Sequence, residues 1–134
     1  MMSAIYEDRA LADKAVEKLR IYAQPQRLMI LSCLLRGERT VSEIDTATSI
    51  GQPALSQQLA ELRRGEMVKT RREAKQVYYD LADEQVALCV RSMEAIFSGA
   101  VANASDLRTA IGEPPKAAPT LTVAGAAAFA RIER

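Results

Sequence analysis

The segment 27–35 carries apolar side chains on almost every side of a helix, which constrains the fold more than any other feature of the sequence. Pro25 can begin this helix, because proline lacks the amide hydrogen that a first turn leaves unpaired, and Gly37 can end it. A helix without a polar face has to be enclosed by other elements. We therefore expect this segment to be the central buried helix.

Apolar residues at helical spacing predict further helices on both sides of this centre. A first helix is expected over roughly 8–23. A short helix begins after a cap at Thr40 or Ser42, since either side chain can accept from a free amide of the first turn. A turn at 49–51 then leads into a helix over roughly 52–64.

Two short runs of β-prone residues follow, at 68–70 and 76–81, with the basic segment 71–75 between them. They predict a hairpin with a basic tip. A last helix is expected over roughly 83–101. The fold class is therefore mainly α with a small β-hairpin wing (α+β).

The composition changes to alanine, proline, threonine and glycine after Asn103. We expect one domain over 1–102 and an Ala/Pro-rich C-terminal tail over 103–134, in which the proline-rich segment 113–119 is a semi-rigid linker. A length of 134 residues agrees with one domain and a tail.

The residue types exclude several classes of function. The sequence has no histidine, and this removes the commonest general base and metal ligand. Cys33 and Cys89 are too few and too far apart for a disulfide scaffold or a cysteine-only zinc site, and they suit a reducing cytoplasm. The sequence also shows no secretory signal or membrane span. We expect a cytoplasmic protein that is not an enzyme and needs no metal or cofactor.

The short helix, the turn and the helix over 52–64 have the size of a DNA-binding helix-turn-helix. Pro53, Ser56 and Gln57 lie opposite the apolar stripe of this last helix, and glutamine can bond to the edge of adenine in the major groove. The alternative is that these helices only form a small helical core.

Basic residues gather directly after this helix. Segment 61–75 has a local charge of +3, although the whole chain has only +1. Such a concentration suits neutralisation of DNA phosphates, while a solvated surface is the alternative. Its basic residues are Arg63, Arg64, Lys69, Arg71, Arg72 and Lys75.

Three segments, 24–31, 55–63 and 76–81, together resemble the ArsR/SmtB family of winged helix-turn-helix repressors. The similarity covers roughly 8–98 and is greatest to the subgroup with the biofilm growth-associated repressor, HlyU and NolR. It implies a homodimer that binds a palindromic DNA operator, with an unknown inducer. Gly65 stands one residue earlier than the family pattern suggests. The resemblance places DNA contacts at Gln52, Ser56, Gln57 and Gln58 and a wing at Arg71, Arg72 and Lys75. We add to these predicted DNA-binding residues Pro53, Arg63, Arg64, Lys69 and Gln76.

The first and last helices each carry an apolar stripe that the small core leaves little room to cover. A two-fold dimer through these helices would cover both, as the resemblance also implies. The alternative is that both stripes pack on their own core. The predicted dimer residues are Leu11, Ala15, Leu19, Val86, Val90, Met93 and Phe97.

Some members of this subgroup sense oxidants or reactive sulfur through two cysteines, and the resemblance places those positions at Ser32 and Ser98. Two explanations stay open: a natural repressor that works without thiols, or an engineered replacement of both cysteines. Cys33 and Cys89 are candidate switch residues, but we favour the interpretation that both are small buried apolar side chains. A protein-interaction module that uses the winged domain and the tail is the alternative function.

Overall fold

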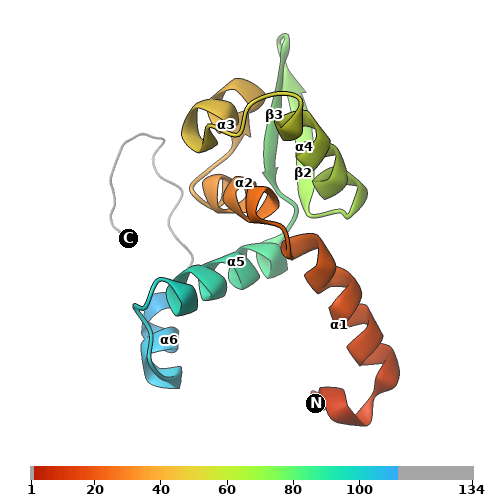
Figure 1. Ribbon diagram of the computed structural model, residues 1–134, viewed down its shortest axis with the longest axis vertical. Coiled ribbons are helices and arrows are strands. Elements are labelled where there is room, and N and C mark those ends of the chain that lie inside the picture. Colours follow the sequence, from red (N-terminus) through yellow and green to blue (C-terminus); the bar gives the residue numbers. More distant parts are fainter. Residues whose placement is uncertain (1, 112–134) are drawn as a thin grey trace.

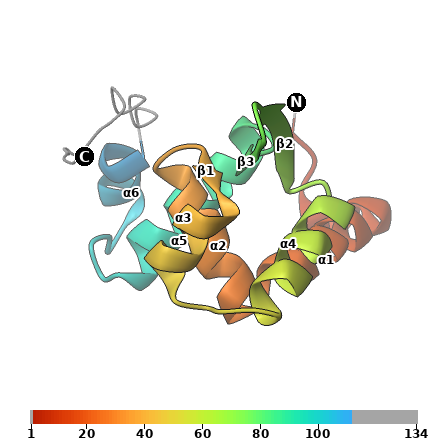
Figure 2. The same cartoon turned by 90° about the horizontal axis from the view of Figure 1, so that it is seen from above.

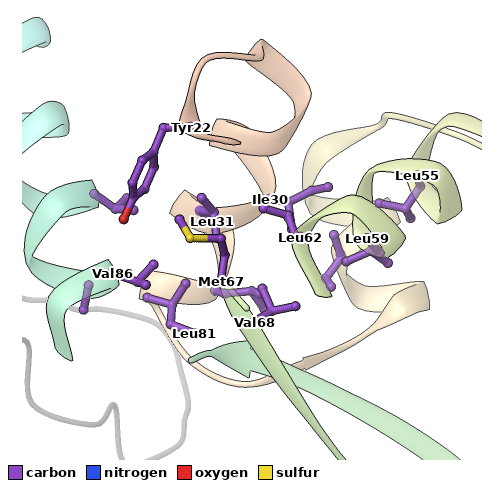
Figure 3. Packing of buried hydrophobic residues seen from close by; sticks show 14 residues of the cluster. Tyr22, Ile30, Leu31, Leu55, Leu59, Leu62, Met67, Val68, Leu81 and Val86 are labelled. Carbon is purple, nitrogen blue, oxygen red and sulfur yellow. The ribbon is translucent and has the colours of Figure 1, made fainter. Parts of the chain in front are cut away.

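Helix α2 (Pro25–Leu35) lies at the centre of the computed structural model, which describes residues 2–111 (Figure 1). Ile30, Leu31 and Leu34 on this helix are at most 1% exposed. Leucine side chains of α4 (Ala54–Arg64) and apolar residues of the sheet and of α5 (Glu84–Phe97) surround them (Figure 3). The predicted central buried helix is confirmed.

The predicted elements are found in the predicted order, with differences at their ends. Helix α5 ends at Phe97 rather than near 101, because Gly99 takes a left-handed backbone with a φ of +83°. Residues 104–111, at the start of the expected tail, form helix α6; the rest of that tail and its linker lie outside the described residues. The remaining elements are η1 (Ile5–Glu7), α1 (Arg9–Tyr22), β1 (Arg39–Thr40), α3 (Val41–Thr48), β2 (Val68–Glu73) and β3 (Gln76–Leu81).

Three short strands form one antiparallel sheet in the order β1-β3-β2. The sequence did not indicate β1, since a strand of two residues has no periodicity to read. Strand β2 is longer than predicted, and its pairing with β3 runs from Val68 opposite Leu81 to Glu73 opposite Gln76. The hairpin therefore turns at 74–75, and most of the expected basic tip is strand.

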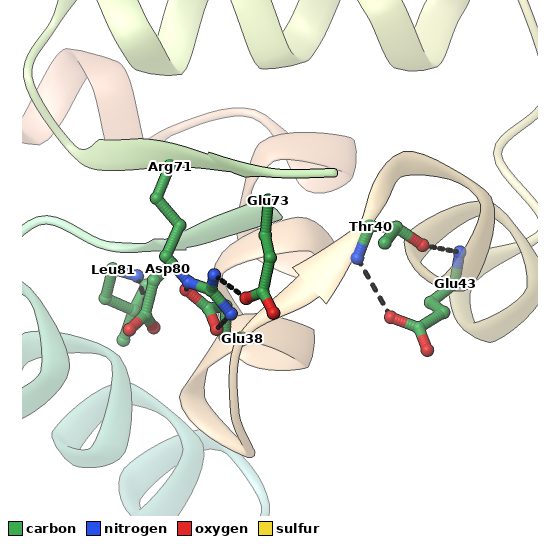
Figure 4. Close-up of polar contacts among 7 residues, drawn as sticks. All are labelled: Glu38, Thr40, Glu43, Arg71, Glu73, Asp80 and Leu81. Atoms are coloured by element: carbon green, nitrogen blue, oxygen red, sulfur yellow. Dashed lines mark hydrogen bonds and ion pairs between the residues drawn. The ribbon is translucent and has the colours of Figure 1, made fainter. Parts of the chain in front are cut away.

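Side chains at the helix ends fix where each helix begins. Thr40 and Glu43 form a reciprocal capping box at α3, in which each side chain accepts from the other residue's amide (Figure 4). Helices α1, α2 and α5 begin with one-way caps. In each, the cap side chain accepts from an amide of the first turn; these residues are Asp8, Gln24 and Asp83. Such caps stabilise a helix by about 1 kcal/mol each.

The turn between α3 and α4 is held by Asp45. Its carboxylate accepts from the Gly51 amide at 2.9 Å, and its backbone carbonyl accepts from the Ser49 amide at 2.7 Å. Ser49 and Gly51 both have positive φ, and glycine adopts this conformation without the steric cost that a side chain adds. The predicted turn at 49–51 is confirmed, and it fixes the orientation of α4 relative to α3.

Helix α4 ends before Gly65, whose backbone angle does not require glycine. Its φ is −82°, and the left-handed residue is the following Glu66. A Cβ atom added at Gly65 would lie 2.5 Å from Cδ1 of Ile21 at the end of α1. Glycine thus leaves room for the end of the Ile21 side chain. Within residues 2–111, none of the helices is long and apolar enough to span a membrane.

Candidate nucleic-acid interface

Helix α4 has one buried face and one exposed face. Leu55, Leu59 and Leu62 point into the core and are at most 3% exposed. Pro53, Ser56 and Gln57, by contrast, are exposed. The helix thus presents small and polar side chains to a second surface, as the sequence predicted for its polar side.

Gln52 and Ser56 interact with each other at the start of α4. The Gln52 carboxamide oxygen accepts from the Ser56 amide at 3.1 Å and from the Ser56 hydroxyl at 2.7 Å. This contact satisfies one of the amides that a helix start leaves unpaired. Among the described residues, the NH₂ group of Gln52 has no hydrogen-bond partner.

Gln58 does not share this exposed face. It is half-buried, and its carboxamide oxygen accepts from Arg27 at 2.9 Å. Arg27 also donates through Nε to the Ile21 carbonyl at 2.7 Å. The guanidinium therefore connects the end of α1, the start of α2 and the middle of α4. A side chain three residues after Leu55 turns back toward the core, and Arg27 holds Gln58 there.

Arg71 is already paired with carboxylates in the wing (Figure 4). It donates to both Glu38 oxygens, at 2.7 and 2.8 Å, and also to Glu73. Its guanidinium carbon lies 4.5 Å from the centre of the Tyr78 ring. The hydrogen bond from Arg71 holds the pKa of Glu38 below its ordinary value. The charge predicted for the wing is thus partly neutralised by Glu38, which is distant in sequence.

The other predicted cations remain exposed around α4 and the wing. Arg64 pairs with Glu61 at 2.6 Å, but both side chains are largely exposed, so the pair is weak in water. Among residues 2–111, no ion pair is found for four cations, and Gln76 is exposed beside them at the wing turn. These four cations are Arg63, Lys69, Arg72 and Lys75.

The predicted dimer residues divide into two groups. Val86 and Val90 are 3% and 2% exposed and pack in the core of the same chain, so assigning them to the dimer surface was wrong. Helix α5 has two apolar faces, and spacing alone does not show which one faces inward. Leu11, Ala15 and Met93 are half-buried, and Leu19 and Phe97 are exposed.

Helix α1 projects away from the rest of the molecule (Figure 1). Val16 and Leu19 on α1 are 45% and 57% exposed, and Leu88, Ile96 and Phe97 are exposed on α5. We call these five residues the apolar dimer surface. Large exposed apolar side chains on two helices are typical of an interface. Of these five residues, only Leu19 and Phe97 were among the predicted dimer residues.

The candidate switch positions are occupied by hydrogen-bonded serines. The Ser32 hydroxyl donates to Glu94, whose carboxylate also accepts from Arg36 at 2.7 Å. The Ser98 hydroxyl donates to the Ala95 carbonyl at 3.3 Å. Serine cannot form a disulfide, and both cysteines are free thiols.

The two cysteines differ in environment. Cys33 is half-buried, and burial raises the pKa of its thiol, against the opposing effect of Arg39 and Arg36. Cys89 is exposed, so the expectation of two buried cysteines holds only partly for Cys33 and is wrong for Cys89. Burial and the neighbouring Cys89 raise the pKa of the Tyr22 hydroxyl. In the described part of the chain, no group of three acidic or cysteine side chains could hold a metal ion.

Residues 24–70 match the family described as "Bacterial regulatory protein, arsR family". The biofilm growth-associated repressor of Agrobacterium fabrum is 46% identical over 79 residues, which are 59% of this chain and 68% of that protein. HlyU and NolR, the other proteins of the predicted subgroup, are also relatives.

Solved structures agree with these sequence matches. The transcriptional repressor BigR of Xylella fastidiosa superposes with a TM-score of 0.66 and 35% identity, covering 75% of this chain and all of that one. A homodimeric winged helix-turn-helix DNA-binding domain of Mycobacterium bovis superposes with a TM-score of 0.60 and 33% identity, covering 72% of this chain and 88% of that one. The predicted fold is confirmed, and the matches are to regulators rather than enzymes. The chain belongs to the arsR family of bacterial regulatory proteins.

Proposed function

We propose that this protein is a homodimeric transcriptional repressor that covers a palindromic operator in the cytoplasm. The observation that carries the proposal is the exposed face of α4, where Gln52, Ser56 and Gln57 lie beside an exposed basic hairpin. Amide side chains suit base edges, and cations suit phosphates. Repression then needs no chemistry, since a bound dimer excludes other proteins from the promoter.

The structure supports a division of roles among the predicted DNA-binding residues. Gln57 and the free amide group of Gln52 would read bases in the major groove, with Ser56 and Pro53 allowing close approach. Gln58 and Arg71 are engaged within the protein and would position α4 and the wing. Phosphate contacts would come from Arg63, Arg64, Lys69, Arg72, Lys75 and Gln76.

The dimer supports the palindromic form of the operator. Two copies related by a two-fold axis present two α4 helices to equivalent half-sites, which lie about 34–36 Å apart, one turn of DNA. The apolar dimer surface is the means of joining them. Both α1 and α5 carry part of that surface. A similar solved structure is homodimeric, which also supports the dimer.

The test compares Gln57→Ala with Arg72→Ala on a promoter fragment from upstream of the protein's own gene and on random DNA. Gln57→Ala should weaken the free energy of binding to the operator by about 1–3 kcal/mol, because one base contact is lost. It should leave binding to random DNA almost unchanged. Arg72→Ala should weaken binding to both DNAs and reduce the slope of log affinity against log salt by about one per subunit. Fluorescence anisotropy titrations at several salt concentrations measure both quantities.

Matched controls are available in parts of the chain far from α4 and the wing. Gln85→Ala and Arg108→Ala remove an exposed amide and an exposed cation from α5 and α6, and both should leave binding unchanged. Equal losses on both DNAs for Gln57→Ala and Arg72→Ala would contradict the division of roles. Absence of binding to either DNA would contradict the proposed function and favour the interaction module.

We further propose that repression does not depend on a thiol switch at Ser32 and Ser98. The Ser32 hydroxyl already holds Glu94 and Arg36 together, a role that requires no oxidation. Treatment with an oxidant or a persulfide should therefore leave operator affinity within about twofold, as measured by anisotropy. Release of DNA on treatment would contradict this proposal. If Cys33→Ser or Cys89→Ser then kept the DNA bound after treatment, that variant would identify the responsible thiol.

A further inference from the structure

A groove between α2, α3 and α5 remains outside the DNA-binding surface. Its volume is about 580 Å³, inside the range of about 300–1,000 Å³ that is usual for small-molecule sites. Its large apolar lining residues are Leu28, Met29, Val90, Met93 and Phe97. Phe97, which belongs to the apolar dimer surface, lies at its edge and is 83% exposed. The groove is therefore large and apolar enough for an organic ligand.

Arg39 contributes a charge to this apolar groove. Its Nε atom is buried, and within residues 2–111 its guanidinium makes neither a hydrogen bond nor an ion pair. A buried donor without an acceptor has lost its hydrogen bond to water and gained none, so native structures rarely keep one. Arg39 is also close enough to Cys33 to oppose the effect of burial on the pKa of the thiol. Among the described residues, the buried Nε of Arg39 thus lacks an acceptor.

The other charged groups near the groove already have partners. Arg36 donates to Glu94 at 2.7 Å and to the Ser32 carbonyl at 3.0 Å. Glu43, which also influences the Cys33 thiol, accepts from the Thr40 amide at 2.9 Å. Arg39 is thus the one lining cation whose donors remain available among the described residues.

We propose that this groove binds a small organic acid with an apolar body. A carboxylate matches the planar donors of a guanidinium and would give Arg39 the acceptor that it lacks. The apolar body would lie along Leu28, Met29 and Met93, and methionine side chains adapt readily to different shapes. A purely apolar ligand would leave the charge unpaired, and a small inorganic anion would leave the apolar walls in water.

The position of the groove makes the bound acid an effector, and this part rests on the proposed function. The walls belong to α3, which leads into α4, and to α5, which carries part of the apolar dimer surface. A ligand between them changes how the DNA-reading and dimerising elements pack. We take octanoate as the test acid. Because the two binding equilibria are linked, octanoate should change the affinity for the operator by some factor, and the operator should change the affinity for octanoate by the same factor.

Isothermal titration calorimetry of the full chain with octanoate tests the site without DNA. We expect saturable binding that is at least about tenfold weaker in Arg39→Gln and at least about tenfold weaker for octan-1-ol, which keeps the chain but lacks the charge. Arg108→Gln removes a cation of equal charge from α6 and should bind octanoate normally. Met93→Trp fills the groove with Arg39 intact and should also abolish binding.

The thermal midpoint of each variant without ligand shows that it is folded. Absence of saturable binding to the wild-type chain overturns the proposal, as does binding that Arg39→Gln and Met93→Trp both leave unchanged. Equal affinity for octanoate and octan-1-ol overturns the role of Arg39. Octanoate binding by a protein that binds no DNA would support the site and contradict only the proposed function.

Discussion

Replacement of Leu19 by aspartate is expected to separate the dimer and to lower operator affinity by about 100-fold or more. Leu19 is 57% exposed on α1, and α1 projects from the body where a second subunit can cover it (Figure 1). A carboxylate in an apolar interface loses its water without gaining a partner. A monomer then contacts one half-site, and the gain from linking two half-sites, about 10²- to 10⁴-fold, is lost.

Sedimentation velocity and anisotropy on the promoter fragment measure the two parts of this prediction. Lys18→Asp is the matched control, because it introduces the same side chain one residue earlier on the exposed, charged part of α1. Circular dichroism should show that Leu19→Asp keeps its helices, since Leu19 is outside the core. A Leu19→Asp protein that remains dimeric and binds normally would show that α1 does not form the interface.

Replacement of Leu31 by alanine should reduce the free energy of unfolding by about 3 kcal/mol. Leu31 is fully buried in the middle of α2, among residues from α4, the sheet and α5 (Figure 3). The smaller side chain leaves a cavity, because elements packed from several sides cannot all move inward. Such a loss is a large part of the total of about 5–15 kcal/mol that stabilises a typical domain.

Urea denaturation followed by circular dichroism measures this loss, at one fixed protomer concentration because dimerisation adds to apparent stability. Leu88→Ala shortens a leucine that is 46% exposed on α5. It should reduce the free energy of unfolding of the subunit clearly less than Leu31→Ala does. A loss below about 1 kcal/mol for Leu31→Ala would contradict the central role given to α2.

The sequence predicted the elements that depend on local patterns. The apolar segment of α2, the turn at 49–51 and the stripe of α4 are each visible in residues close together, so the helix-turn-helix and its wing followed from them. The ends were less accurate: α5 is shorter and β2 is longer than expected. Strand β1 was missed, because its pairing with Tyr78 and Tyr79 is set by the tertiary fold.

The polar contacts of the site needed the tertiary structure. Arg27 and Gln58 are 31 residues apart, Arg71 and Glu38 are 33 residues apart, and no local pattern indicates that either pair meets. Because these contacts hold Gln58 and Arg71 within the protein, we propose that both residues position α4 and the wing.

What the sequence by itself determined is the order of the elements, the helix-turn-helix and the family, because periodicity and motifs are properties of neighbouring residues. Only the tertiary structure decided which apolar faces are enclosed: Val86 and Val90 face the core, while Leu19 and Phe97 remain exposed. It also decided which charges are paired and left Arg39 without a partner among residues 2–111. Burial and pairing depend on segments distant in the chain, so they are settled only when the chain has folded.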